Sequence, residues 1–102
     1  MNFSGMLKEG ALKDKVIIVT GGGTGLGKSM GKYFMELGAH LIITSRRQEV
    51  LDETAAEFNH YNGEVLPISG DVRDHKDVKR IIESSLDKFG KIDCLLNNAA
   101  GN

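Results

Sequence analysis

The sequence has few of the residues that build disulfides and metal centres. Its 102 residues include one cysteine, one proline and no tryptophan, and its three histidines are scattered along the chain. One cysteine excludes an internal disulfide and a cysteine-based metal site, and histidines without ligand spacing lead us to predict no metal. Cys94 lies within an apolar run, where we expect a buried thiol that acts as a small hydrophobic side chain.

Neither sign of charge is in excess, and long apolar runs are missing. The chain has 13 basic and 14 acidic side chains, for a formal net charge of -1 at pH 7. No segment reaches membrane-spanning length, and residues 1–15 are charged rather than continuously apolar. These absences predict a cytoplasmic protein with neither a nucleic-acid nor a membrane partner.

Apolar runs alternate with stretches of helical periodicity along the rest of the chain. The run Val16–Val19 is β-branched throughout, which is typical of a parallel strand covered on both faces. Further strands are predicted over residues 41–43, 64–69 and 92–96. Helices are predicted over residues 26–37 and 74–89, and a third helix between them carries Val50, Leu51, Ala55 and Phe58 on one face.

The first and last helices also carry apolar faces that we expect to pack on the sheet. In the helix over residues 26–37, this face is predicted to consist of Leu26, Met30, Tyr33, Phe34 and Leu37. In the helix over residues 74–89, it is predicted to consist of Val78, Ile81, Ile82 and Leu86. We further expect Asp74 to cap the start of this last helix and Gly90 to end it.

Strands that alternate with helices are joined by crossover connections, which are right-handed in parallel sheets. We therefore predict the α/β fold class, with a Rossmann-type, doubly wound parallel sheet of strand order 3-2-1-4. Pro67 agrees with this order, because proline is tolerated at a sheet edge and the third strand is outermost. Residues 1–14 are predicted to be a lead-in, and residues 15–102 to be half of a dinucleotide-binding domain.

A glycine-rich segment, Thr20–Gly27, joins the first strand to the first helix. Glycines permit a sharp turn and a close approach of the backbone to a pyrophosphate, which the N-terminal N–H groups of the next helix can bind. A loop of this kind between a strand and a helix predicts dinucleotide binding. The residues predicted to contact the cofactor here are Gly21, Gly23, Thr24, Gly25, Leu26 and Gly27.

The same segment fits a competing motif. Residues 22–29 read Gly-Gly-Thr-Gly-Leu-Gly-Lys-Ser, which satisfies the phosphate-loop pattern G-x-x-x-x-G-K-S/T of nucleoside triphosphatases. In that alternative, Lys28 would bind the β- and γ-phosphates and Ser29 would ligate magnesium. The residues that follow the later strands favour the dinucleotide instead.

The second strand is followed by Ser45, Arg46 and Arg47. At this position, the acid that NAD-binding proteins carry hydrogen-bonds the adenosine ribose. A serine with two arginines instead offers charge-assisted donors to the 2′-phosphate of NADP. These three residues therefore predict NADP(H) as the cofactor.

Residues after the third and fourth strands are placed for the rest of the cofactor. Asp71 can meet the amino group of adenine, and Val72 can pack on the ring. After the fourth strand, residues 97–98 are tandem amides that can tie strand ends together, and small residues follow that leave space for a ribose and a nicotinamide. The predicted contacts in this last segment are Asn98, Ala99, Ala100 and Gly101.

Together these motifs resemble the short-chain dehydrogenase/reductase family. The family's glycine pattern T-G-x-x-x-G-x-G is matched from Thr20 to Gly27, its Asp-Val adenine contact at residues 71–72, and its N-N-A-G element at residues 97–101. The resemblance extends from Lys15 to the last residue. It implies an NADP-dependent oxidoreductase that forms homo-oligomers.

The additional alanine in the N-N-A-A-G element is similar to the 2,4-dienoyl-CoA and trans-2-enoyl-CoA reductase branch, which implies an unsaturated fatty acyl-CoA as substrate. The family's catalytic Tyr-x-x-x-Lys and its partner serine follow the fourth strand, so the resemblance assigns no catalytic residue here. We therefore expect a truncated chain that is inactive by itself and leaves residues 92–96 as an exposed apolar edge. The alternative is a module that binds the dinucleotide without catalysis.

Overall fold

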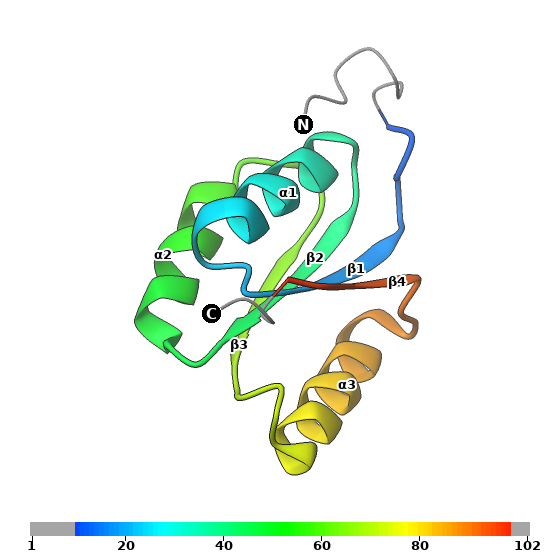
Figure 1. Cartoon of the computed structure of the whole chain (residues 1–102). Coiled ribbons are helices and arrows are strands. Elements are labelled where there is room, and N and C mark those ends of the chain that lie inside the picture. The colour runs from blue at the N-terminus through cyan, green and yellow to red at the C-terminus, as the bar shows by residue number, and fades with distance from the viewer. Residues whose placement is uncertain (1–9, 99–102) are drawn as a thin grey trace.

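A computed structural model describes residues 10–98, which form four parallel strands and three α-helices in alternation (Figure 1). Their bounds are β1 (Val16–Thr20), α1 (Gly25–Glu36), β2 (His40–Ser45), α2 (Gln48–Phe58), β3 (Val65–Ser69), α3 (His75–Phe89) and β4 (Cys94–Asn97). The predicted elements are thus confirmed in type and order, with small shifts at their ends.

The strands form one sheet in the order β3-β2-β1-β4, as predicted. All three pairings are parallel, so the carboxyl ends of the strands lie along one edge of the sheet. Pro67 lies on the outermost strand β3, where it is paired in register with Ile43 of β2. An edge strand tolerates the missing N–H of proline because one of its sides has no ladder to complete.

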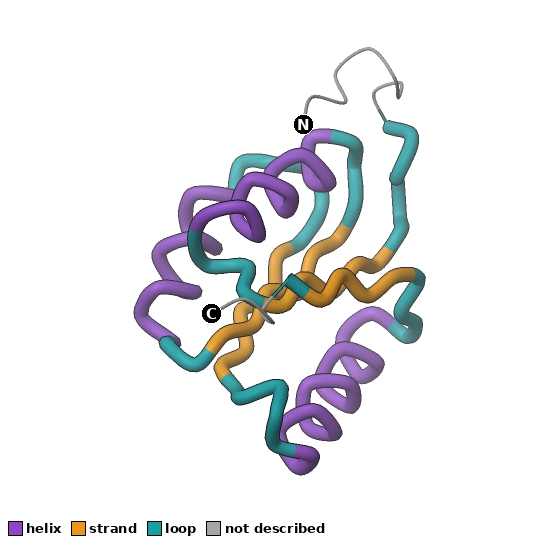
Figure 2. Tube along the Cα trace, viewed as in Figure 1, coloured by secondary structure: helices purple, strands orange, loops and turns teal. Residues whose placement is uncertain are grey.

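Helices cover both faces of the sheet, with α1 and α2 on one face and α3 on the other (Figures 1 and 2). Successive side chains of a strand point to opposite faces, and β1 shows the consequence directly. Its Ile17 and Val19 belong to the core cluster that contains Met35 of α1 and Leu51 of α2. Its other two aliphatic side chains, at positions 16 and 18, belong to a second cluster with Ile81 of α3.

The predicted inner face of α1 is confirmed only in part: Leu37, just past the end of the helix, is 5% exposed, and Phe34 packs against the core. Within the helix, Gly27, Gly31 and Met35 are the buried residues, whereas Leu26 is 64% exposed. A Cβ atom built on Gly31 would lie 2.9 Å from Leu41 Cδ2, so the helix approaches β2 more closely than a side chain would permit. The apolar pattern wrongly assigned Leu26 to the inner face and missed Gly27 and Gly31, because glycine contributes nothing to an apolar periodicity.

The ends of α3 follow the prediction. The Asp74 side chain accepts a hydrogen bond from Lys76 N at 2.9 Å, and Gly90 ends the helix in the left-handed conformation with φ of 79°. Side-chain capping satisfies one of the free N–H groups in the first turn, and glycine adopts positive φ without a steric penalty.

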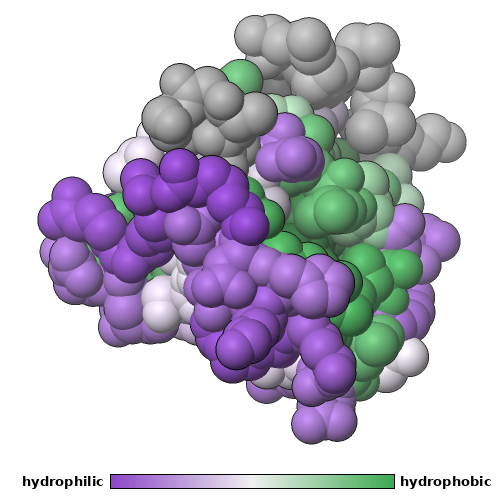
Figure 3. Space-filling view, turned by 60° about the horizontal axis from the view of Figure 1, so that its bottom comes forward, coloured by the Kyte–Doolittle hydropathy of each residue, from purple (hydrophilic) through white to green (hydrophobic). Residues whose placement is uncertain are grey.

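The outer side of α3 and β4 is less buried than predicted. Ile82 and Leu86 were expected to face inward but are 40% and 44% exposed, and Cys94 is exposed rather than buried. Leu95 on β4 is 60% exposed, as expected for an apolar edge. Within the described residues, β4 pairs only with β1, so nothing covers its far side. Figure 3 shows apolar surface gathered along one side of the molecule, beside a hydrophilic area.

Candidate functional site

A cleft of about 710 Å³ lies where the carboxyl ends of all four strands meet the start of α1. In open α/β sheets, ligands bind in the crevice outside these strand ends. Most of the predicted site residues line this cleft. It is also lined by four other residues, Thr44, Gly70, Arg73 and Asn97. The predicted residues that line it are Gly21, Gly23, Thr24, Gly25, Leu26, Ser45, Arg46, Arg47, Asp71, Val72 and Asn98.

Four predicted residues are not among those that line the cleft in the described part of the chain. Gly27 lies behind the cleft wall, on the buried side of α1. Ala99, Ala100 and Gly101 lie outside the described residues.

The glycine loop follows β1 closely and turns into α1 through unusual backbone angles. Gly21 and Gly25 have φ of 67° and 57°, backbone angles that residues other than glycine rarely adopt. The N–H of Gly21 donates to Thr44 O at 2.7 Å and holds the start of the loop against β2. Thr24, the N-cap of α1, makes no side-chain capping bond, and the first turn contains no acid. The first N–H groups of α1 therefore remain available to an anion in the cleft.

Gly27 brings the helix start against the end of β4. A Cβ atom at this position would overlap Gly21 O and would lie 2.7 Å from Asn98 Nδ2. Real Cβ atoms do not approach other atoms this closely, so glycine is required here for packing rather than for a positive φ. This contact places the Asn98 side chain directly beside the glycine loop.

Thr20 joins β1 to the end of β4. Its hydroxyl donates to Asn97 Oδ1 at 2.9 Å and accepts a hydrogen bond from Asn98 N at 2.7 Å. The predicted role of the tandem amides, to tie strand ends together, is seen in this contact. Thr44, paired with Thr20 in the β1–β2 register, has a buried hydroxyl without a hydrogen-bond partner among the described residues.

The two arginines after β2 differ in their surroundings. The Ser45 hydroxyl accepts a hydrogen bond from Arg47 N at 3.3 Å and so turns the chain at the start of α2. Arg47 Nε donates to Glu49 Oε1 at 3.1 Å, outside the strand end. Arg46 makes no ion pair within the described residues, although its positive charge contributes to lowering the pKa of Asp71. Arg46 is therefore the cation of this pair that is free to meet an anion.

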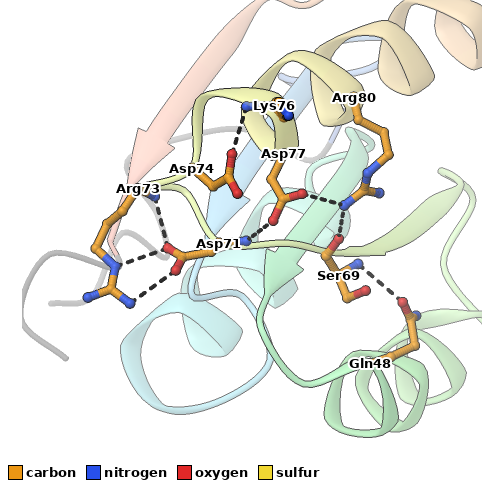
Figure 4. Close-up of polar contacts among 8 residues, drawn as sticks. All are labelled: Gln48, Ser69, Asp71, Arg73, Asp74, Lys76, Asp77 and Arg80. Atoms are coloured by element: carbon orange, nitrogen blue, oxygen red, sulfur yellow. Dashed lines mark hydrogen bonds and ion pairs between the residues drawn. The ribbon is translucent and has the colours of Figure 1, made fainter.

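Asp71 is paired with Arg73, a residue that the sequence analysis did not assign to the site. Asp71 Oδ1 accepts hydrogen bonds from Arg73 N and Nε at 2.9 and 3.0 Å, and Oδ2 accepts from Nη2 at 3.0 Å (Figure 4). The side-chain bonds from Arg73, followed by its backbone N–H, lower the pKa of Asp71 from 3.8 to about 2. An aspartate followed two residues later by an arginine was the available sequence signal, because aspartate often accepts from the backbone two residues on.

Lys28 and Ser29 are not among the residues that line this cleft. Lys28 Nζ forms an ion pair with Glu57 Oε2 at 2.7 Å, and both residues line a separate hollow near the end of α2. The lysine of a phosphate loop must reach the phosphates that the loop cradles. The structure therefore gives no support to the triphosphatase alternative.

The described residues contain neither a metal-binding group of side chains nor a membrane-spanning helix. Across residues 10–98, no three His, Cys, Asp or Glu side chains gather into a group that could hold a metal ion. No helix in the same range is both long enough and apolar enough to cross a membrane.

The fold and its cleft define a Rossmann-type α/β protein. The family described as short chain dehydrogenase matches residues 15–102, which is most of the chain. The protein therefore belongs to the short-chain dehydrogenase family, as its motifs predicted.

Curated relatives include a probable 2,4-dienoyl-CoA reductase from Bacillus subtilis, 41% identical over 91 residues. Another is a probable 2,4-dienoyl-CoA reductase from Caenorhabditis elegans, 46% identical over 101 residues. The matches cover 89% and 97% of this chain but 36% and 33% of those proteins. The chain thus spans about a third of the length of these relatives.

Solved structures of the same family superpose well. L-sorbose reductase from Gluconobacter frateurii, complexed with NADPH and L-sorbose, has a TM-score of 0.82 and 32% identity, and the match covers 85% of this chain and 34% of that one. A 3-ketoacyl-(acyl-carrier-protein) reductase from Brucella melitensis, complexed with NADH, has a TM-score of 0.76 and 35% identity over 82% of this chain and 33% of that one. Both nicotinamide dinucleotides thus occur in these structural neighbours.

Proposed function

We propose that the cleft binds NADP(H) and that the chain is the cofactor-binding part of an NADPH-dependent reductase. The observation that carries this proposal is the placement of Arg46. Its guanidinium is exposed at the end of β2, beside Ser45 on the cleft wall, and it forms no ion pair within the described residues. A cation beside a serine at this strand end suits the 2′-phosphate that distinguishes NADP from NAD.

The cleft fits a dinucleotide in size and lining. Its volume of about 710 Å³ lies within the usual range for ligand sites. The uncapped N–H groups of α1 would hold the pyrophosphate, and Asp71 with Val72 would hold the adenine. Thr44 also lines the cleft, and its buried hydroxyl has no hydrogen-bond partner among the described residues. Asn98 would contribute at the ribose and nicotinamide end, and we propose that residues 99–101 contact the cofactor as well.

We infer an unsaturated fatty acyl-CoA as the substrate class, because the curated relatives from B. subtilis and C. elegans are named as 2,4-dienoyl-CoA reductases. When bound, NADPH supplies the hydride for such a reduction. The residues of this chain contribute binding and orientation of the cofactor, and we assign none of them a catalytic role. Catalysis and homo-oligomer formation are proposals for the whole protein.

The cellular compartment also stays a prediction. A cytoplasmic location was expected from the sequence, yet another relative is a peroxisomal 2,4-dienoyl-CoA reductase from Arabidopsis thaliana, 36% identical over 93% of this chain and 32% of its own length.

Titration of the purified chain with NADPH, NADH and MgATP tests the cofactor. We expect NADPH to bind about tenfold or more tightly than NADH, as a charge-assisted contact with the 2′-phosphate would produce. Arg46→Ala should remove most of this preference. Arg47→Ala is the matched control and should remove less of it, because the Arg47 side chain is already paired with Glu49 at 3.1 Å.

Other outcomes would contradict the proposal. Equal affinity for NADPH and NADH, or an Arg46→Ala variant that keeps the preference, would show that the strand end does not read the 2′-phosphate. Tight MgATP binding that Lys28→Ala abolishes would favour the triphosphatase instead.

A second assay with NADPH and a 2,4-dienoyl-CoA should show binding without NADPH oxidation, because we expect this chain to lack catalytic residues.

A further inference from the structure

We propose that Arg73 is a positioning residue for adenine recognition: its guanidinium holds the Asp71 carboxylate so that one acceptor site, on Oδ2, stays open to the adenine amino group. This inference rests on the proposed binding of NADP(H). It adds Arg73, which lies on the cleft wall and acts on the cofactor only indirectly, by orienting Asp71.

The backbone around Asp71 is held from two sides (Figure 4). The N–H of Asp71 donates to Asp77 Oδ2 of α3 at 2.8 Å. Just before it, Ser69 N donates to Gln48 Oε1 of α2 at 3.1 Å, and Ser69 O accepts from Arg80 Nη2 of α3 at 2.6 Å. Because these contacts come from both neighbouring helices, the main freedom left to Asp71 is the rotation of its own side chain.

Arg73 removes that rotation. A carboxylate has two oxygens with about four acceptor sites in all. Both sites on Asp71 Oδ1 are used, one by Arg73 N and one by Arg73 Nε, and one of the two on Oδ2 is used by Nη2. Since a guanidinium is planar and its N–H groups have a fixed geometry, this two-point contact orients the carboxylate plane as a single ammonium would not.

The remaining site on Oδ2 can accept a hydrogen bond but cannot donate one. The carboxylate is ionised and acceptor-only at neutral pH, because its ordinary pKa of 3.8 is already far below 7 and the same contacts lower it to about 2. An acceptor-only group suits the amino group at position 6 of adenine. It repels the carbonyl oxygen that hypoxanthine carries at that position. Because Arg73 fixes the direction of this acceptor through two hydrogen bonds to Asp71, it would make the cleft selective for the base.

The experiment compares the affinities of the chain for NADPH and for its deaminated analogue, in which hypoxanthine replaces adenine. Both ligands carry the same phosphates, so loss of a positive charge affects them alike and cancels in their ratio. We expect the unmodified chain to prefer NADPH by about tenfold. In Arg73→Ala this ratio should fall toward one, and in Arg73→Lys it should stay intermediate.

Lys79→Ala is the matched control, because it removes one positive charge from α3 at a side chain that is 72% exposed and paired with Glu83. It should leave the ratio unchanged. A double-variant comparison adds a second readout: Arg73→Ala should lower the ratio little further in a chain that already carries Asp71→Ala, because Arg73 acts through that carboxylate.

The outcomes separate this inference from the cofactor assignment. If Arg73→Ala weakens both ligands by the same factor, Arg73 contributes only charge and the inference is wrong, although NADP(H) binding stands. A ratio near one in the unmodified chain would overturn it in the same way. If the unmodified chain binds neither ligand, both the cofactor assignment and this inference fail.

Discussion

The Thr20 hydroxyl donates to Asn97 Oδ1 at 2.9 Å and thereby joins the carboxyl ends of β1 and β4. The same oxygen accepts from Asn98 N at 2.7 Å. One buried hydroxyl therefore serves Asn97, the last residue of β4, and Asn98, the residue after it, and both asparagines line the cleft.

We predict that Thr20→Val destabilises the chain by about 1–3 kcal/mol, because the Asn98 N–H loses its partner in a part-buried site. The free energy of unfolding, measured with urea, checks this value. Thr44→Val is the control. The Thr44 hydroxyl is buried and has no partner within the described residues, so its removal should be neutral or slightly stabilising. Equal losses in the two variants would show that the Thr20 contacts contribute nothing specific.

Gly27→Ala should destabilise the chain by about 1–3 kcal/mol and weaken NADPH binding. The new Cβ would overlap Gly21 O, so α1 would have to move away from the loop that precedes it. Urea unfolding and an NADPH titration measure the two effects. Ser29→Ala, at an exposed position of the same helix, should change the stability by less than about 0.5 kcal/mol. A Gly27→Ala chain that kept both its stability and its NADPH affinity would contradict the close packing of α1.

The Asp71–Arg73 pair should stabilise the fold only above a defined pH. The pKa of Asp71 is lowered from 3.8 to about 2 in the folded chain. A lowered pKa contributes stability that is complete above the unfolded value and is lost as pH falls toward the folded one. The difference in urea midpoint between the unmodified chain and Asp71→Asn should therefore be constant from pH 7 to about 5, shrink below about 4 and be largely lost near 2.

Asp93 is present in both of these chains. A hydrogen bond from Val16 N, followed by one from Lys91, also lowers its pKa, and its effect cancels in the comparison. A midpoint difference that stayed constant down to pH 2 would show that the Asp71 carboxylate gains nothing from its partner.

Cys94 should react with a thiol reagent in the folded chain, because it is exposed on β4. We expect the full amount of one thiol per chain without denaturant, at a rate close to that of the unfolded chain. Cys94→Ser should show no reaction and serves as the blank. A thiol that reacts only after urea is added would mean that β4 is covered in solution, for example by a second copy of the chain.

Most of the fold was predictable because its signals are local. The apolar run at Val16–Val19 and the glycines that follow β1 indicated a buried parallel strand and a sharp turn into a helix without knowledge of the rest. Asp74 and Gly90 were correctly assigned as caps of α3 for the same reason, since capping depends on the residues next to the helix end. Strand order also followed, because crossovers have one preferred hand.

Burial was less predictable, because it depends on neighbours from elsewhere in the chain. Leu26 looked like a core residue of α1, but Gly27 and Gly31 are the positions that face the sheet. Cys94 lies in an apolar run that looked buried, yet β4 is an edge strand within the described residues. A hydrophobic pattern indicates which residues favour burial, and the packing of other elements decides which of those residues are buried.

The sequence by itself determined the alternation of strands and helices, the parallel sheet and most of the strand-end residues that line one cleft. Only the tertiary structure decided which of the charged residues among them form ion pairs. It paired Arg47 with Glu49 and Arg73 with Asp71, and it left Arg46 without an ion pair in the described part of the chain. Residue type and spacing specify which ion pairs are possible, whereas side-chain geometry in the folded chain selects among them.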